Sequence, residues 1–207
     1  MDRSKLKRLG VLWVVAAVIS VLPIGVARAA DNLKIRWDLI SVDFTNPPTL
    51  SPGGQASASN TKDGTSITMT GSGTFSSNSG KPQNVTGGGT WETFAEDGIT
   101  MTGSGTYKVA GFVSFVLAPG PNPPPTIIDN VCSDCVLHSG LAVLRIAYSD
   151  GSEGVLVLSC NLDAGTPESV FEGITVTKDF IDYWNRHDPV DGPPPVDGNR
   201  TLIHILQ

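Results

Sequence analysis

Apolar and polar residues alternate with a period of two over much of the chain, which is the pattern of β-strands that bury one face. The clearest example is a seven-residue phrase that occurs three times, starting at Met69, Val85 and Met101, so that the copies are sixteen residues apart. The copies read MTGSGTF, VTGGGTW and MTGSGTY. Because sixteen is an even number, equivalent residues of each copy fall on the same face of a sheet. The repeat therefore predicts three consecutive strands of an antiparallel meander.

One face of this meander is apolar with a glycine-rich centre, and the other carries threonine and serine hydroxyls. If the copies pair centre to centre, Trp91 lies opposite both Met69 and Met101. The same register stacks six glycines into one patch, at positions 71, 73, 87, 89, 103 and 105. Glycine weakens a strand, so such a patch indicates either sharp curvature, as in a small barrel, or close packing of other atoms on the backbone. We expect atoms of the same chain to cover the patch, with a bound ligand as the alternative.

Further strands are predicted on both sides of the meander, at 33–43, 111–118, 141–148, 155–162, 169–177 and 201–206. The Pro/Gly/Ser-rich segment 46–59 is expected to lie outside the central strands, and 179–185 to form one or two helical turns. A total of about nine strands without a long amphipathic helix predicts an all-β fold. We expect the meander to close into a barrel-like sheet, or to form one half of a two-sheet sandwich. The curvature inferred from the glycine patch favours the barrel.

The first 29 residues have the composition of a signal peptide. A basic start with Arg3, Lys5 and Arg8 precedes an apolar run over 9–26, and the sequence Ala-Arg-Ala at 27–29 supplies a cleavage site. We therefore expect residues 1–29 to be removed and residues 30–207 to form a single secreted or extracytoplasmic domain. The alternative is a protein tethered to the membrane by an uncleaved signal anchor, because the apolar run is nearly long enough to span a bilayer.

The charge of the remaining chain narrows the range of partners. Without residues 1–29, nine basic and nineteen acidic residues remain, a formal net charge of −10 compared with −6 for the full chain. This balance argues against nucleic acid and anionic lipid as partners, and we expect no stable membrane insertion after cleavage. No phosphate-binding loop, nucleophile elbow or metalloprotease motif is present, so no cofactor is predicted. Nothing in the sequence sets the oligomeric state.

Three cysteines, Cys132, Cys135 and Cys160, predict a disulfide in an oxidising compartment. Pairing back from the turn of the predicted 141–162 hairpin places Cys160 a few residues from Cys135. We therefore expect a bridge from Cys160 to Cys135 or Cys132, while a bridge between Cys132 and Cys135 is another possibility. A zinc site formed by the three cysteines and His138 is the alternative to any disulfide.

The segment 180–188 carries the best candidates for ligand binding. Tyr183 and Trp184 are amphipathic rings suited to stacking on sugars, and Arg186, His187 and Asp188 offer polar contacts beside them. The sequence thus predicts a non-enzymatic binding or surface-associated protein, with a carbohydrate or small apolar ligand at the barrel mouth near these residues. The alternative is an extracytoplasmic hydrolase or isomerase with a site near His187 and Asp188.

Overall fold

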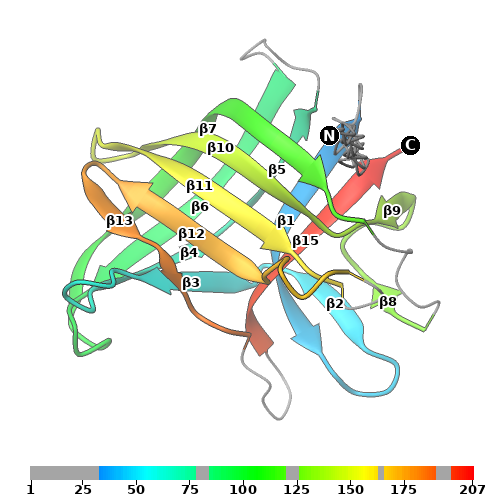
Figure 1. The fold of residues 1–207 in the computed structure, drawn as a ribbon, viewed down its shortest axis with the longest axis horizontal. Helices are drawn as coiled ribbons and strands as arrows, with labels where there is room; N and C mark the ends of the chain where they lie inside the picture. The colour runs from blue at the N-terminus through cyan, green and yellow to red at the C-terminus, as the bar shows by residue number, and fades with distance from the viewer. Residues whose placement is uncertain (1–32, 78–83, 120–125, 163–165, 190–196) are drawn as a thin grey trace, which may run out of the picture.

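The computed structural model describes residues 33–77, 84–119, 126–162, 166–189 and 197–207. The predicted signal peptide lies outside the described residues. Within them the chain forms fifteen β-strands and no α-helix, which confirms the predicted all-β class (Figure 1). The strands are β1 (Lys34–Asp43), β2 (Thr49–Pro52), β3 (Gln55–Ser59), β4 (Ser66–Thr70), β5 (Ser72–Ser76), β6 (Val85–Phe94), β7 (Met101–Leu117), β8 (Ile128–Asp129), β9 (Cys135–Leu137), β10 (Gly140–Tyr148), β11 (Glu153–Cys160), β12 (Gly173–Lys178), β13 (Ile181–Tyr183), β14 (Asn185–Arg186) and β15 (Asp197–Leu206).

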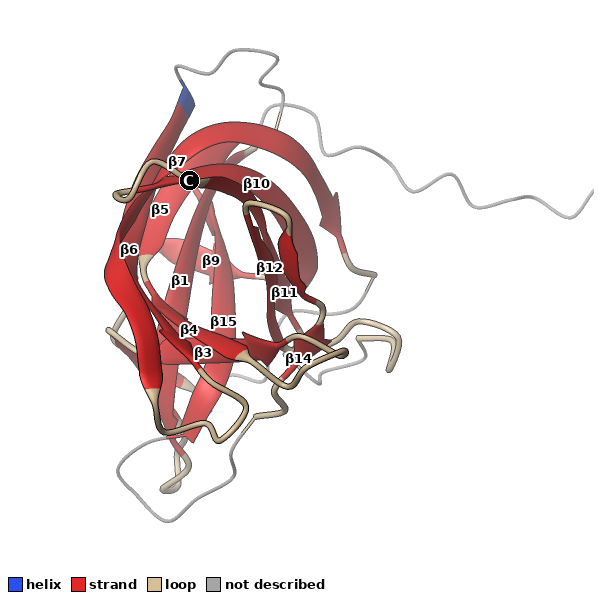
Figure 2. Cartoon of the chain, turned by 90° about the vertical axis from the view of Figure 1, so that its left-hand side faces the viewer, coloured by secondary structure: helices blue, strands red, loops and turns tan. Residues whose placement is uncertain are grey.

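All of these strands belong to one hydrogen-bonded sheet. Its main path has the order β13-β12-β11-β10-β7-β6-β5-β1-β15-β9, with β4, β3 and β14 branching from β6, and β2 and β8 branching from β1. The sheet is mixed because β2 and β8 are parallel, whereas the other pairs are antiparallel. It curls strongly (Figure 2), and β3 comes into contact with β12 and β15 across the interior.

The sheet does not close, so the predicted barrel is wrong, and the single hydrogen-bonded sheet also excludes the predicted two-sheet sandwich. The reason lies in the strands after β12. The short strand β13 pairs only with β12, and the chain then leaves this edge to pair as β14 with β3. The two sides of the curl approach each other where β12 lies close to β3, without a continuous ladder between these two strands.

Strands β1 and β15 are buried because apolar clusters cover both of their faces. On the inner face, Trp37 and Leu39 belong to the main core, together with side chains from β4, β6, β10, β11 and β12. On the opposite face, Ile40 and Leu202 form a second, smaller cluster with Leu50 of β2. Successive side chains of β1 therefore pack into two apolar clusters, one on each face of the strand, instead of alternating between a core and the solvent.

The first half of the repeat has the predicted register, and the second half does not. Met69 pairs with Trp91, as expected from centre-to-centre pairing. Trp91 then pairs on its other side with Gly105 instead of Met101, a shift of four residues. As a result Met101 is half exposed, in contrast to Met69, which is completely buried.

Atoms of the same chain cover the glycines, as predicted, and for Gly71, Gly73, Gly103 and Gly105 these include aromatic side chains. A Cβ atom added to Gly73 would lie 2.9 Å from Nε1 of Trp37, and one added to Gly105 would lie 3.0 Å from Nε1 of Trp91. Tyr107, which is 2 % exposed, lies opposite Gly89 in the ladder. Most of these glycines thus make room for large rings that pack close to the backbone, which explains why a strand repeat contains so many of them.

Three predicted segments differ from the structure. Segment 46–59 contains β2 and β3, which pair with β1 and β4 respectively despite the prolines and glycines nearby. The expected helical turn at 179–185 is instead β13 and the start of β14, because the inward side chain of Tyr183 extends the core at the β12 edge. The two strands expected around residue 110 are one continuous strand, β7, which passes through two register shifts against β10.

Candidate functional site

The five predicted ligand-binding residues lie in β13, between β13 and β14, in β14 and directly after it, but the structure does not gather them into one site. Tyr183 is buried, with 3 % of its surface exposed, whereas 58 % of Trp184 is exposed. Consecutive side chains of an extended chain point to opposite faces, so the two rings cannot stack on the same ligand surface.

The three polar candidates lie nearer the other end of β12. The guanidinium of Arg186 lies 4.5 Å from the ring centroid of Phe171, and the backbone N–H of His187 donates to Ser57. The carbonyl of Asp188 accepts a hydrogen bond from the amide of Asn199. These residues are close to Gly173, the first residue of β12, whereas Tyr183 pairs with Val176. Gly173 and Val176 are three residues apart along β12, a distance of about 10 Å.

Tyr183 does line a cavity, at the end of the sheet where β12 turns into β13; Figure 2 views the molecule from this side. The cavity has a volume of about 340 Å³, within the range typical of small-molecule sites. We call it the Lys178 cavity. It is lined by Asp63, Thr65, Trp91, Thr93, Phe94, Thr102, Gly103, Asp150, Lys178, Ile181 and Tyr183.

An ion pair at the centre of this cavity fixes the position of Lys178. Its ammonium donates to Oδ2 of Asp150 at 2.5 Å and to Oγ of Ser152 at 2.8 Å. It also lies 4.6 Å from the ring centroid of Trp91 and 5.2 Å from that of Tyr148, as in cation–π contacts. The hydrogen bond from Lys178, assisted by those from Ser152, lowers the pKa of Asp150 to about 2. Asp150 is therefore an ionised acceptor over the whole physiological pH range.

A second carboxylate faces the same space from the turn between β3 and β4. Asp63 Oδ1 accepts hydrogen bonds from the hydroxyl of Thr65 at 2.7 Å and from its backbone N–H at 3.0 Å, and these bonds lower the pKa of Asp63. The lining thus combines two ionised carboxylates, one ammonium and three threonine hydroxyls with aromatic rings. It offers both hydrogen-bond donors and acceptors beside apolar surface, and its net charge is negative.

Lys178, Asp150 and Asp63 were not among the residues predicted from the sequence. Asp150 occupies a hairpin turn, where an acidic residue is ordinary, and Lys178 simply ends an apolar strand. Lys178 and Asp150 come together because β12 pairs with β11, which brings the end of β12 to the turn that precedes β11. No spacing in the sequence reports this contact.

The disulfide joins Cys132 to Cys135, and Cys160 is a free, buried thiol, so the expected bridge to Cys160 is wrong. Cys160 pairs with Gly140 and points into the main core, close to the predicted register. Cys135, however, begins β9 and pairs with Leu206 at the far edge of β15. With two of the sulfurs bonded to each other, the alternative zinc site is not formed, and no cluster of three or more His, Cys, Asp or Glu side chains suited to a metal occurs in the described part of the chain.

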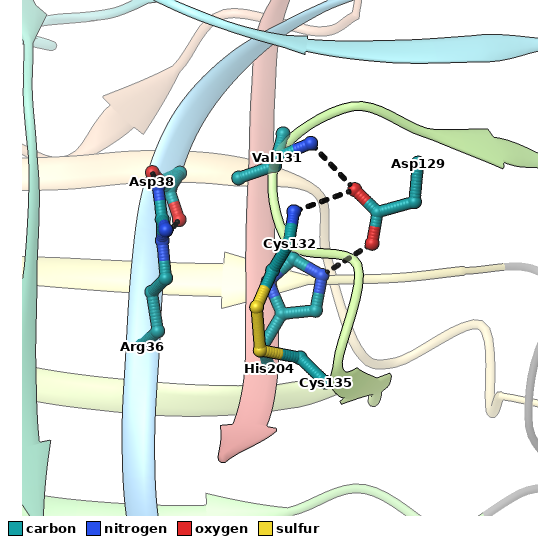
Figure 3. The surroundings of a disulfide bond; sticks show 7 residues. All are labelled: Arg36, Asp38, Asp129, Val131, Cys132, Cys135 and His204. Atoms are coloured by element: carbon teal, nitrogen blue, oxygen red, sulfur yellow. Dashed lines mark hydrogen bonds and ion pairs between the residues drawn. A yellow bond between two sulfur atoms is a disulfide. The ribbon is translucent and has the colours of Figure 1, made fainter.

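Asp129 anchors the disulfide loop to β15 (Figure 3). Its Oδ1 accepts hydrogen bonds from the backbone N–H groups of Val131 and Cys132, and its Oδ2 lies 2.7 Å from Nε2 of the fully buried His204. Arg36, opposite His204 in the ladder, is held by Asp38 through two hydrogen bonds. The Asp129–His204 contact thus ties the loop to the sheet, which gives this region a structural role.

Replacing Cys132 and Cys135 together with serine should lower the free energy of unfolding by about 2 kcal/mol, because the bridge closes only a short loop. Urea denaturation measures this difference. Thiol titration of the unmodified protein should detect no reactive thiol in the native state and one thiol, that of Cys160, after unfolding. A peptide map that links Cys160 to either of the other cysteines would contradict the assignment.

Comparison with protein-family models, with curated proteins and with solved structures finds no match for this chain. Among the described residues, there is no helix with the length and apolar character needed to cross a bilayer.

Proposed function

We propose that this protein is a non-enzymatic, extracytoplasmic binding protein whose ligand is a neutral carbohydrate held in the Lys178 cavity. The observation that carries the proposal is the combination, in one cavity, of the Lys178–Asp150 ion pair with the rings of Trp91, Phe94 and Tyr183. The export signal expected at residues 1–29 supports an extracytoplasmic location. Tyr183 remains the only one of the five predicted ligand residues that lines this cavity.

The polar lining distinguishes between the two ligand classes expected from the sequence. A purely apolar ligand would remove water from two carboxylates and an ammonium without replacing their hydrogen bonds, which is unfavourable. Each hydroxyl of a sugar both donates and accepts, so a sugar can bond to Asp63 and Asp150 as well as to Lys178 and the threonines. Its C–H faces can pack on the ring edges. The two carboxylates outnumber the single ammonium and disfavour anionic sugars.

The enzymatic alternative has no such support. Asp182 and Asp188 are exposed, and neither they nor His187 lines the Lys178 cavity. Asp182 accepts a hydrogen bond from the amide of Asn60, and the backbone of His187 pairs with Ser57. The structure therefore offers no cavity that brings an acid and a base from among these three described residues to one substrate atom.

The test is to measure the affinity of the protein for glucose, galactose, mannose, N-acetylglucosamine and glucuronate by calorimetry. At least one neutral sugar should bind, and more tightly than glucuronate. Lys178→Met should weaken that binding roughly tenfold or more, because the ammonium donates hydrogen bonds from a charged group.

Trp184→Ala is the matched control, since Trp184 is exposed on the face of the chain opposite to Tyr183. It should leave the affinity unchanged. Loss of binding in Trp184→Ala together with full binding in Lys178→Met would place the ligand on the outer surface and contradict the proposal.

A further inference from the structure

A second cavity lies at the opposite end of β12, where the two apolar clusters meet. Its volume is about 120 Å³, and its walls are mainly aliphatic: Ile40, Val42, Leu50, Ile127, Leu162 and Leu202. Phe44, half exposed, stands at its edge with the guanidinium of Arg200 5.1 Å from the ring centroid. No residue is shared with the lining of the Lys178 cavity.

One carboxyl group, that of Glu172, lines this apolar cavity, which we call the Glu172 pocket. Glu172 directly precedes β12 and is 9 % exposed. Its Oε2 accepts the backbone N–H of Asn161 at 2.6 Å, and its Oε1 accepts the backbone N–H of Thr201 at 2.5 Å. These bonds fix the carboxyl group in place, so it is preorganised for a ligand.

Burial favours the protonated form of this carboxyl group, whereas its hydrogen bonds favour the ionised form. The hydroxyl of Thr201 lies 2.6 Å from the carbonyl oxygen of Ser159, to which it must donate, since a carbonyl can only accept. The same hydroxyl lies 3.2 Å from Oε1 of Glu172. Burial raises the pKa of Glu172 to about 8, although the hydrogen bonds from Thr201 and Asn161 and the charge of Arg200 oppose this effect. At neutral pH the group is therefore a neutral acid that both donates and accepts hydrogen bonds.

We propose that the Glu172 pocket is a second binding site, which takes a small neutral molecule with one hydroxyl group and an apolar body. An apolar cavity of about 150 Å³ holds benzene, so the slightly smaller Glu172 pocket, about 120 Å³, takes a body of at most about six carbon atoms. A hydroxyl group matches the neutral carboxyl because each can donate to the other. A carboxylate would face the carboxyl of Glu172, and an ammonium would face the positive charge of Arg200, so both are disfavoured. This site is independent of the carbohydrate proposed for the Lys178 cavity.

Phenol and benzene are suitable probes because they differ only in the hydroxyl group. Titration of methyl-labelled protein at pH 6 should give saturable shifts of the Ile40 and Leu202 methyl signals. Phenol should bind roughly tenfold more tightly than benzene, the effect of one well-placed hydrogen bond. Glu172→Leu should remove this preference.

Two tryptophan variants of adjacent residues locate the binding. Ile127 lines the pocket, whereas Ile128 is 45 % exposed and does not. Ile127→Trp should fill the pocket and abolish the methyl shifts, and Ile128→Trp should retain them. The proposal is overturned if phenol causes no saturable shift in the unmodified protein, if it binds no better than benzene, or if Ile127→Trp binds phenol as before. None of these three outcomes depends on the folding of a Glu172 variant or on sugar binding.

Discussion

The free energy of unfolding should fall by about 4 kcal/mol as the pH rises from 4.5 to 8, and Glu172→Gln should remove most of this decrease. Burial raises the pKa of Glu172 from 4.5 to about 8 in the folded protein. Between these values the folded state keeps a proton that the unfolded state has released. Stability from this group is therefore complete below pH 4.5, decreases as the pH rises, and is lost above pH 8.

Urea denaturation of both proteins at intervals between pH 4.5 and 8.5 measures this effect. Other groups also titrate: burial lowers the pKa of His138, which opposes the trend near pH 6. Their contributions cancel in the difference between the variant and the unmodified protein at each pH. The glutamine amide cannot accept both N–H donors, so the variant will be less stable at pH 5. The test therefore compares the slopes of the free energy of unfolding against pH, not the stabilities at one pH. Parallel pH profiles for the two proteins would show that Glu172 ionises normally.

Gly73→Ala should lower the free energy of unfolding by about 3 kcal/mol, the effect of overpacking a tightly packed core. An added Cβ atom would overlap the carbonyl oxygen of Thr86 and lie 2.8 Å from Cα of Gly87 and 2.9 Å from Nε1 of the fully buried Trp37. Two of these three contacts are with the backbone of β6, so the clash cannot be relieved by a rotamer change.

Gly198→Ala is the matched control for this substitution, because the nearest atom to its added Cβ, the carbonyl oxygen of Gln55, is 3.7 Å away. We expect its effect to remain within about 0.5 kcal/mol. Thermal or urea unfolding measures both variants. Equal stabilities of the two variants would mean that the cover over the glycines is loose, and would contradict the packing described for the repeat.

The sequence alone predicted which side chains of the first two repeat copies point inward, because the local alternation of apolar and polar residues determines this. Met69 and Trp91 pair as predicted because both strands keep one register across the first hairpin. The third copy shifts because the second hairpin is centred on Asp97-Gly98, two residues beyond the midpoint between copies. Asp97 fixes this turn by accepting hydrogen bonds from the N–H groups of Ile99 and Thr100. The Asp-Gly signal was visible in the sequence, and it determined the register in preference to the repeat.

The sites were less predictable because they depend on pairing between distant segments. Tyr183 was expected in a helical turn beside His187, but it lies in β13, and its separation from His187 follows from the crossing of β14 to β3. Lys178 meets Asp150 only because β12 pairs with β11, and Glu172 is buried only because the start of β15 covers it. Local patterns do not encode such contacts, whose partners are 28 and 29 residues apart.

The most direct test of carbohydrate binding is a ¹⁵N NMR titration with the neutral sugars, with the indole N–H of Trp91 and the backbone N–H groups of Thr65 and Thr102 as reporters. These three residues line the Lys178 cavity from three different strands or turns. We predict saturable shifts confined to this lining for at least one sugar. Shifts centred on Trp184 instead, or no saturable shift with any sugar, would contradict the proposed function.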